Sequence, residues 1–232
     1  MQNATHAVLS MSVVGRKHKE NQDRALARVI PWAPTPLCLL AVADGISSCQ
    51  FGASVARFIV ERHLGTDTIF KPDGPSVVEQ LRQYLVALNR EFHDEFSDME
   101  DMQASGASLS GAVLYGDMAD CLWVGDSPIY ILRHSVAGFA SEMIMRPDKK
   151  GNALTDHFGG AAPFELKHRH VTLSPGDILT ITSDGVVHDE GLLGDAYTRL
   201  GFSQAFLDDV KNRAYRSPVC DDISVVACQR RR

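Results

Sequence analysis

The stretch LLAVADGISSCQFGASVAR at residues 39–57 constrains the fold of this chain more than any other feature. It opens with five apolar residues, too few for a helix, which predict a buried strand that ends at Asp44-Gly45. A carboxylate at the end of a core strand is seldom a packing residue. The glycine after it lets another group approach the backbone closely. Asp44 is therefore the first candidate for a functional side chain.

Three segments are predicted to be helices. Ser47 or Ser48 is a suitable N-cap for the first, which follows the strand and runs to about Leu64. Apolar residues recur at helical spacing over residues 76–96, and this is the clearest helical pattern in the chain. Residues 202–215 carry the same pattern over a shorter length.

Continuous or alternating apolar runs predict strands at residues 7–14, 25–30, 37–43, 108–114, 119–124, 129–133, 165–173, 178–182 and 223–228. The turn-rich segment PWAPTP joins the second and third of these as a hairpin. Asp23 and Asp44 should therefore lie at the same end of one sheet. The acidic residues 96–102 are expected to form a solvated connection, and residues 134–160 have no regular pattern.

Composition limits the class of protein. The 232 residues are enough for one sizeable core, so we expect a single domain over residues 1–232. The formal net charge of -6 argues against a nucleic-acid partner, and the longest apolar run is too short to span a membrane. The five cysteines show no C-x-x-C spacing and no signal peptide is evident, which together predict reduced thiols in a cytoplasmic protein.

The aspartates that stand at the edges of predicted strands are Asp23, Asp44, Asp126, Asp184 and Asp221. In an antiparallel meander, all but Asp126 could gather at one rim, where their charges would repel unless cations neutralised them. Oxygen-only clusters suit Mg²⁺ or Mn²⁺ better than Zn²⁺. The histidines without metal-ligand spacing, predicted to be surface or helix-cap residues, are His157, His168, His170 and His188. Taken singly, each Asp-Gly pair is also typical of a plain turn.

The ordered set of motifs carries more information than any single aspartate. The motifs are GRKHKENQD (residues 15–23), VADGISS (42–48), SGASLSGAVLYGDMADCLWVGDSPIYILR (105–133), LSPGDILTITSDGV (173–186) and DDISVV (221–226), with NALTDHFGG (152–160) as a weaker match. In wording and order they resemble the metal-dependent Ser/Thr protein phosphatases of type 2C, especially bacterial members. Together they span nearly the whole chain.

This resemblance implies an α+β fold, an α-β-β-α sandwich of two antiparallel sheets flanked by helices. It also implies a site at one edge of the sandwich that holds two divalent cations, Mn²⁺ or Mg²⁺, with a third bound more weakly. The implied roles are metal binding by Asp44, the Gly45 carbonyl, Asp184 and Asp221, third-metal binding by Asp126, and an outer acceptor role for Asp23. A water molecule activated by the metals would then hydrolyse phosphoserine or phosphothreonine.

Some positions depart from the family pattern. His18 replaces the arginine that often grips the substrate phosphate, although Arg16 and its neighbours keep the loop basic. Both are therefore candidate phosphate-binding residues, and His18 with Asp23 is a candidate catalytic residue. Ile46 replaces a histidine that is a candidate general acid in many eukaryotic members, which leaves protonation of the leaving group to water. Pro128 replaces a common arginine.

The resemblance also implies partners and leaves alternatives open. The substrate would be a phosphorylated protein, and some bacterial members are paired with a Ser/Thr kinase. Residues 134–160 could form the family's variable flap near the site. One alternative is a catalytically silent, phosphatase-like module that binds a phosphoprotein or a regulator. Another is a phosphatase that acts on a small phosphate ester.

Overall fold

The computed structural model describes residues 5–66, 69–136, 138–151, 153–160, 165–186 and 190–231. Its elements in chain order are β1 (His6–Val13), β2 (Asp23–Ile30), β3 (Leu37–Gly45), α1 (Gly52–Arg57), the wider helix η1 (Phe58–Leu64), α2 (Val77–Glu95), α3 (Glu100–Gln103), β4 (Ala107–Tyr115), β5 (Met118–Val124), β6 (Ile129–Ser135), β7 (Gly138–Met143), β8 (Lys149–Lys150), β9 (Ala153–Leu154), β10 (Lys167–Thr172), β11 (Ile178–Thr182), α4 (Glu190–Leu200), α5 (Gln204–Ala214) and β12 (Ile223–Arg230).

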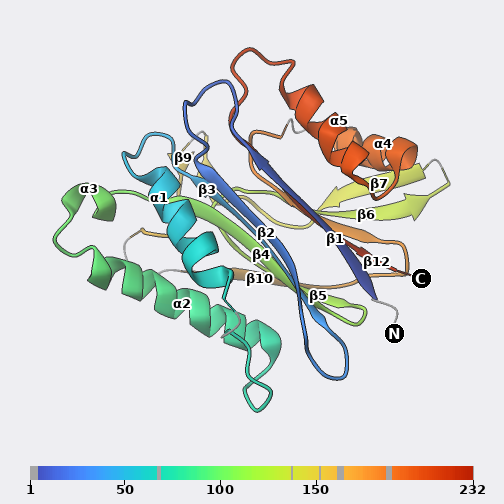
Figure 1. Ribbon diagram of the computed structural model, residues 1–232, viewed down its shortest axis with the longest axis horizontal. Helices are drawn as coiled ribbons and strands as arrows, with labels where there is room; N and C mark the ends of the chain where they lie inside the picture. The colour runs from blue at the N-terminus through green and yellow to red at the C-terminus, as the bar shows by residue number, and fades with distance from the viewer. Residues whose placement is uncertain are drawn as a thin grey trace.

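Two antiparallel sheets form the centre of the molecule. One has the strand order β1-β12-β11-β6-β7 and the other the order β10-β5-β4-β3-β2, while β8 and β9 make a small separate hairpin. Figure 1 shows α1 and α2 on the outer side of one sheet and α4 and α5 on the outer side of the other. The predicted α-β-β-α sandwich is therefore confirmed. Among the described helices, none combines the length and apolar character needed to cross a membrane.

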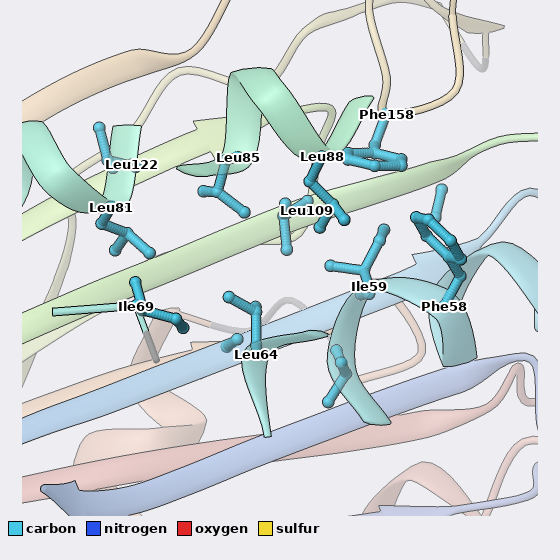
Figure 2. Packing of buried hydrophobic residues seen from close by; sticks show 14 of the residues in the cluster. Phe58, Ile59, Leu64, Ile69, Leu81, Leu85, Leu88, Leu109, Leu122 and Phe158 are labelled. Atoms are coloured by element: carbon cyan, nitrogen blue, oxygen red, sulfur yellow. The ribbon is translucent and has the colours of Figure 1, made fainter. Parts of the chain in front are cut away.

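The strand β3 is buried on both faces, which explains its unbroken apolar sequence. Leu39 and Ala41 on one face belong to the core under α1, η1 and α2. Leu40 and Val42 on the other face belong to the core between the two sheets. Figure 2 shows the helix side of this arrangement, where leucines of α2 pack over β4 beside residues of η1. A central strand enclosed in this way places the residue at its end, Asp44, firmly at the rim.

A third apolar layer lies between the other sheet and its helices. Val225 and Ala227 of β12 pack there against α4 and α5, while Val226 faces the core between the sheets. The rings of Tyr197 and Phe206 stack in this layer with centroids 3.8 Å apart. The sandwich therefore has three apolar layers, which fix the ends of its central strands relative to one another.

The first predicted helix begins later than expected. Ser47 and Ser48 are exposed in a turn, and the helix starts at Gly52 with Phe51 in the N-cap position. The Phe51 backbone N–H instead donates to the Ser105 hydroxyl at 3.1 Å. The predicted serine cap is therefore wrong, because the helix begins beyond both serines and has no side-chain cap hydrogen bond.

Other differences concern segments with weak sequence patterns. Residues 134–160, where no regular structure was expected, contain β7, β8 and β9. The helix α4 was not predicted. The connection at residues 96–102 includes the start of α3, and Met102 is buried there. Asn152, which opens one of the family-like motifs, and His188 lie outside the described residues.

A buried carboxylate beside β10 gives a pH-dependent contribution to stability. The Asp120 side chain accepts hydrogen bonds from the Tyr115 hydroxyl at 2.7 Å and from His168 and His170 at 2.8 and 2.9 Å. Although burial raises the pKa of Asp120, the hydrogen bonds from Tyr115 and the histidines outweigh it, so the pKa is lowered overall. The ionised carboxylate therefore stabilises the folded state.

We expect Asp120→Asn to lower the free energy of unfolding by about 1–3 kcal/mol near pH 6. A folded-state pKa below the unfolded value of about 3.9 means that this stabilisation is lost as the pH falls through the folded-state pKa. Urea unfolding near pH 6 and at about pH 2.5 should therefore show the difference from the wild type shrinking in acid. An equal difference at both pH values would contradict this, and Asp117→Asn on the exposed β4–β5 turn is the control.

Candidate active site

Two aspartates face each other across the hairpin of β2 and β3. Asp23 begins β2 and Asp44 lies at the end of β3, and the strand register pairs them directly. This confirms the prediction that both lie at one end of the sheet. Like charges directly opposite one another destabilise a sheet, so this pair requires another source of neutralisation.

The second sheet brings two further aspartates to the same rim. Asp184 follows β11 and Asp221 precedes β12, and these neighbouring strands are joined beyond their ladder by the Ser183 N–H, which donates to the Ser224 carbonyl at 3.0 Å. Asp44, Asp184 and Asp221 all line one cavity of about 520 Å³. Side chains that are far apart in the sequence therefore meet in space, as the sequence analysis expected.

The pKa of Asp44 reflects the closeness of the other aspartates. Its pKa lies well above the ordinary value, first because the carboxyl is buried and then because of the charges of the neighbouring aspartates, which are Asp23, Asp184, Asp126 and Asp221. In the described part of the chain, the cavity is lined by four carboxylates and by two basic side chains, Lys17 and His157. Such an excess of negative charge favours bound cations.

Asp126 reaches the cavity from the turn between β5 and β6. Gly125 before it has a φ of 95°, and a Cβ there would lie 2.5 Å from the Ser108 Cβ. The hydroxyls of Ser108 and Ser127 hydrogen-bond to each other, which holds the turn against β4. The Asp126 carboxylate contacts the Lys149 ammonium at 3.2 Å. The turn at Pro128 thus still delivers the predicted aspartate to the site.

Gly45 stands where the backbone is too crowded for a side chain. A Cβ on Gly45 would lie 2.5 Å from the backbone carbon of Gly52. The Gly45 N–H donates to the Gln22 carbonyl at 3.2 Å, and the Ile46 N–H donates to the Gly106 carbonyl at 3.0 Å. Gly45 lines the cavity beside Asp44. Glycine at this position lets the strand end and the following helix pack closely.

Asp23 lies deeper than the other aspartates, at 1% exposure. Burial raises its pKa to about 7, against the lowering effect of hydrogen bonds from Ser183 and Ser224, while the charges of Asp222 and Asp184 raise it further. Its Oδ2 atom has no hydrogen-bond partner among the described residues. A buried carboxylate oxygen of this kind suits the predicted role of an outer acceptor, which stays a prediction.

Asp222, for which the sequence suggested no role, anchors the loop of residues 15–23. Its carboxylate accepts hydrogen bonds from the backbone N–H groups of Gly15 and Gln22, both at 2.7 Å. The His18 Nδ1 atom lies 3.0 Å from Asp222 and 3.1 Å from Asp221. The ligand atoms of these three side chains all lie within 4.8 Å of one another. His18 therefore contacts the acidic rim itself.

The basic residues of this loop point to different surroundings. The Lys17 ammonium lies 2.6 Å from the Asp221 carboxylate, and Lys17 lines the cavity. The Arg16 guanidinium lies over the ring of Tyr215, 5.9 Å from its centroid. Neither Arg16 nor His18 is among the described residues that line the cavity. Their phosphate-binding roles stay predictions, and Lys17 becomes a further candidate.

His157 is a cavity residue that the sequence analysis missed. It was expected to be a surface or cap histidine, but it is half-buried and lines the cavity with the aspartates. Its place depends on contacts between segments far apart in the sequence, so spacing alone gave no signal. The only sequence hint was its position in the NALTDHFGG segment.

The chemistry of the cavity fits hard divalent cations. Its aspartates offer oxygen ligands. Cys49 also lines the cavity, and its thiol donates to the Ala104 carbonyl at 3.4 Å. Carboxylate and carbonyl oxygens are the ligands that Mg²⁺ and Mn²⁺ prefer. The raised pKa of Asp44 shows how poorly the cluster tolerates its own charge without such ions.

Comparisons with known proteins agree with this arrangement. A family model described as Protein phosphatase 2C matches residues 15–218. In a search of curated proteins, nothing matches. Among solved structures, PppA, described as a key regulatory component of T6SS in Pseudomonas aeruginosa, is 26% identical, with a TM-score of 0.75 and 97% of each chain covered.

Two further solved structures share the fold at lower identity. The serine/threonine phosphatase PstP/Ppp of Mycobacterium tuberculosis is 18% identical, with a TM-score of 0.80, and the match covers 98% of this chain and 99% of that one. A PstP catalytic domain described as a complex with 2 manganese ions is 19% identical, with a TM-score of 0.79 and 97% of each chain covered.

The repulsion around Asp44 predicts opposite effects of one substitution. Asp44→Asn should raise the melting temperature of the protein in EDTA, because it removes an acidic group whose burial and repulsion by the neighbouring aspartates destabilise the folded state. The same variant should lose most of the stabilisation that Mn²⁺ gives the wild type, about 2.7 kcal/mol at 100 times the dissociation constant. Melting curves with and without Mn²⁺ measure both effects.

The control for this experiment is Asp73→Asn, in an exposed turn before α2, which should respond to Mn²⁺ as the wild type does. An Asp44→Asn protein that keeps the full Mn²⁺ response would show that Asp44 holds no ion.

Proposed function

This chain belongs to the protein phosphatase 2C family, and we propose that its acidic cavity hydrolyses phosphoserine and phosphothreonine side chains of proteins with Mn²⁺ or Mg²⁺ bound there. The observation that carries the proposal is the meeting of Asp23 and Asp44 from one sheet with Asp184 and Asp221 from the other. A catalytically silent module would have no need to maintain so costly a set of like charges.

Each aspartate has a place in this proposal. Asp44, which feels the charges of all the others, would hold both ions, with the Gly45 carbonyl on one of them. Asp184 and Asp221 would complete the second ion's ligands, and Asp126 would bind a third ion more weakly. When bound, such ions neutralise phosphoryl charge and lower the pKa of water, which supplies hydroxide to attack phosphorus near pH 7.

The remaining residues position the reactants. Asp23, buried and directly opposite Asp44, would accept a hydrogen bond from the attacking water. Lys17 lines the cavity and offers an ammonium to the phosphoryl oxygens once a cation neutralises Asp221. His18, in contact with Asp221 and Asp222, would keep the loop against the acidic rim.

The function also implies a partner and a compartment. Phosphoserine and phosphothreonine are made by protein Ser/Thr kinases, so a cognate kinase is the enzyme that must supply the substrate. The five cysteines are all free thiols, which supports a reducing compartment such as the cytoplasm.

We expect the wild type with Mn²⁺ to hydrolyse both p-nitrophenyl phosphate and a phosphothreonine peptide, and EDTA to abolish both activities. Asp184→Ala should reduce kcat by at least about 1000-fold, because removal of one ion withdraws several kcal/mol of transition-state stabilisation. Released phosphate is the measurement, with thermal melting as the check on folding.

The outcomes separate the alternatives. Hydrolysis of neither substrate by folded, Mn²⁺-loaded protein would support a silent binding module instead. Hydrolysis of only the small ester would support a small-molecule phosphatase. A folded Asp184→Ala protein with wild-type activity would reject the proposed metal site.

Lys17 and Arg16 can be compared as phosphate-binding residues. Lys17→Ala should raise KM for the phosphothreonine peptide about tenfold with a smaller change in kcat, because a charged hydrogen bond to phosphate contributes about 1.5–3 kcal/mol and partial exposure weakens it. Steady-state kinetics of Lys17→Ala and Arg16→Ala give the comparison. A larger rise in KM for Arg16→Ala would assign phosphate binding to Arg16 instead.

A further inference from the structure

Hydrolysis of a phosphorylated serine or threonine has a requirement that the aspartates do not meet. The leaving group is an alkoxide, a strong base that departs readily only when it is protonated. Ile46, which follows Asp44-Gly45 and lines the cavity, has no proton to give. Lys17 is already proposed to bind the phosphoryl oxygens, and an ordinary lysine ammonium keeps its proton at pH 7. Among the described lining residues, His157 is the one imidazole, the side chain whose proton exchanges most readily near neutral pH.

The backbone around His157 is firmly anchored. Phe158, the next residue, exchanges two backbone hydrogen bonds with Ala107 of β4, at 3.0 and 2.9 Å. The Phe158 ring is fully buried and lies 5.9 Å from the ring of Phe92 and 6.5 Å from that of Phe58. Figure 2 shows Phe158 within this cluster. His157 is therefore carried on a rigid part of the fold.

The imidazole itself packs closely against glycine. A Cβ on Gly106 would lie 2.2 Å from the His157 Cδ2 atom, so any other residue at position 106 would displace the ring. The Gly160 N–H donates to the His157 carbonyl at 3.2 Å, which closes the turn on the other side. These contacts hold the ring in one place on the cavity wall.

The two ring nitrogens have different surroundings. Nδ1 is buried and has no hydrogen-bond partner among the described residues. Because His157 lines the cavity while Nδ1 is enclosed, Nε2 is the nitrogen that can meet a ligand there. A half-buried imidazole whose Nδ1 atom has no polar partner in the described part of the chain is unusual and favours a functional role.

The charges near His157 determine when it carries a proton. Burial lowers its pKa, partly opposed by the charge of Asp156, so the ring of the free protein is mainly neutral at pH 7. Among the described residues, the other ionisable groups around His157 are His93 of α2, which contacts the Gly160 carbonyl at 3.0 Å, and the cavity carboxylates with Lys17. With cations on those carboxylates, an entering phosphoryl dianion would favour the protonated ring.

We propose that His157 is the general acid of this site and protonates the serine or threonine oxygen as it leaves phosphorus. This assignment rests on the proposed phosphatase function. The electron pair of the breaking P–O bond passes to the leaving oxygen, which takes the proton from the imidazolium and departs as an alcohol. Water supplies the new oxygen on phosphorus, and a proton from solvent restores His157, so the products are the alcohol and inorganic phosphate.

The test compares two leaving groups. With saturating Mn²⁺, His157→Ala should lower kcat for a phosphothreonine peptide about 100-fold, the usual effect of losing a general acid. The loss for p-nitrophenyl phosphate should be at least about ten times smaller, because nitrophenolate is stable as an anion and leaves without a proton. His157→Gln, which keeps a hydrogen-bond donor but cannot carry a transferable proton, should behave like His157→Ala.

Controls separate this role from folding and from metal binding. His134→Ala, an exposed histidine on β6, should keep wild-type kinetics on both substrates. Calorimetric titration with Mn²⁺ and thermal melting should give the same affinity and a folded protein for both His157 variants. Equal losses on the two substrates, restored activity in His157→Gln, or weakened Mn²⁺ binding would each overturn the assignment. A wild type inactive on both substrates would overturn the proposed function, and this assignment with it.

Discussion

Asp23 and Asp44 lie opposite each other at the end of one hairpin, and the rest of the site depends on how the protein tolerates that pairing. Asp184 and Asp221 add to the same repulsion, which is why the pKa of Asp44 rises so far. The fold gains nothing from these charges, so the hydrophobic layers must hold them together. Divalent cations convert this destabilising cluster into a binding site.

The sandwich is what makes the cluster possible. Central strands such as β3 are buried on both faces, so their ends cannot shift without disturbing two apolar layers. The aspartates stand on those ends and on the tight turns beside them, where close contacts of Gly45 with Gly52 and of Gly125 with Ser108 exclude any side chain. Asp222 then fastens the loop of residues 15–23 onto the rim through two backbone N–H groups. The packed sheets therefore position the aspartates, and the aspartates at the strand ends supply the chemistry.

The sequence predicted what depends on local pattern. The hairpin of β2 and β3 follows from two apolar runs and a turn-rich connection, and it alone places Asp23 beside Asp44. Contacts distant in sequence could not be predicted: Ser105 accepts the Phe51 N–H just before the helix, and the pairing of Phe158 with Ala107 places His157 on the cavity wall. The strand β7 was missed because it is an edge strand with no fully buried residue, so its apolar pattern is weak.

Anomalous X-ray scattering from crystals of this protein grown with Mn²⁺ tests the metal site most directly. Two strong manganese peaks are expected at the rim of the sandwich, with Asp44 bound to both and Asp184 and Asp221 bound to one. Manganese elsewhere on the protein, or none within bonding distance of Asp44, would contradict this expectation.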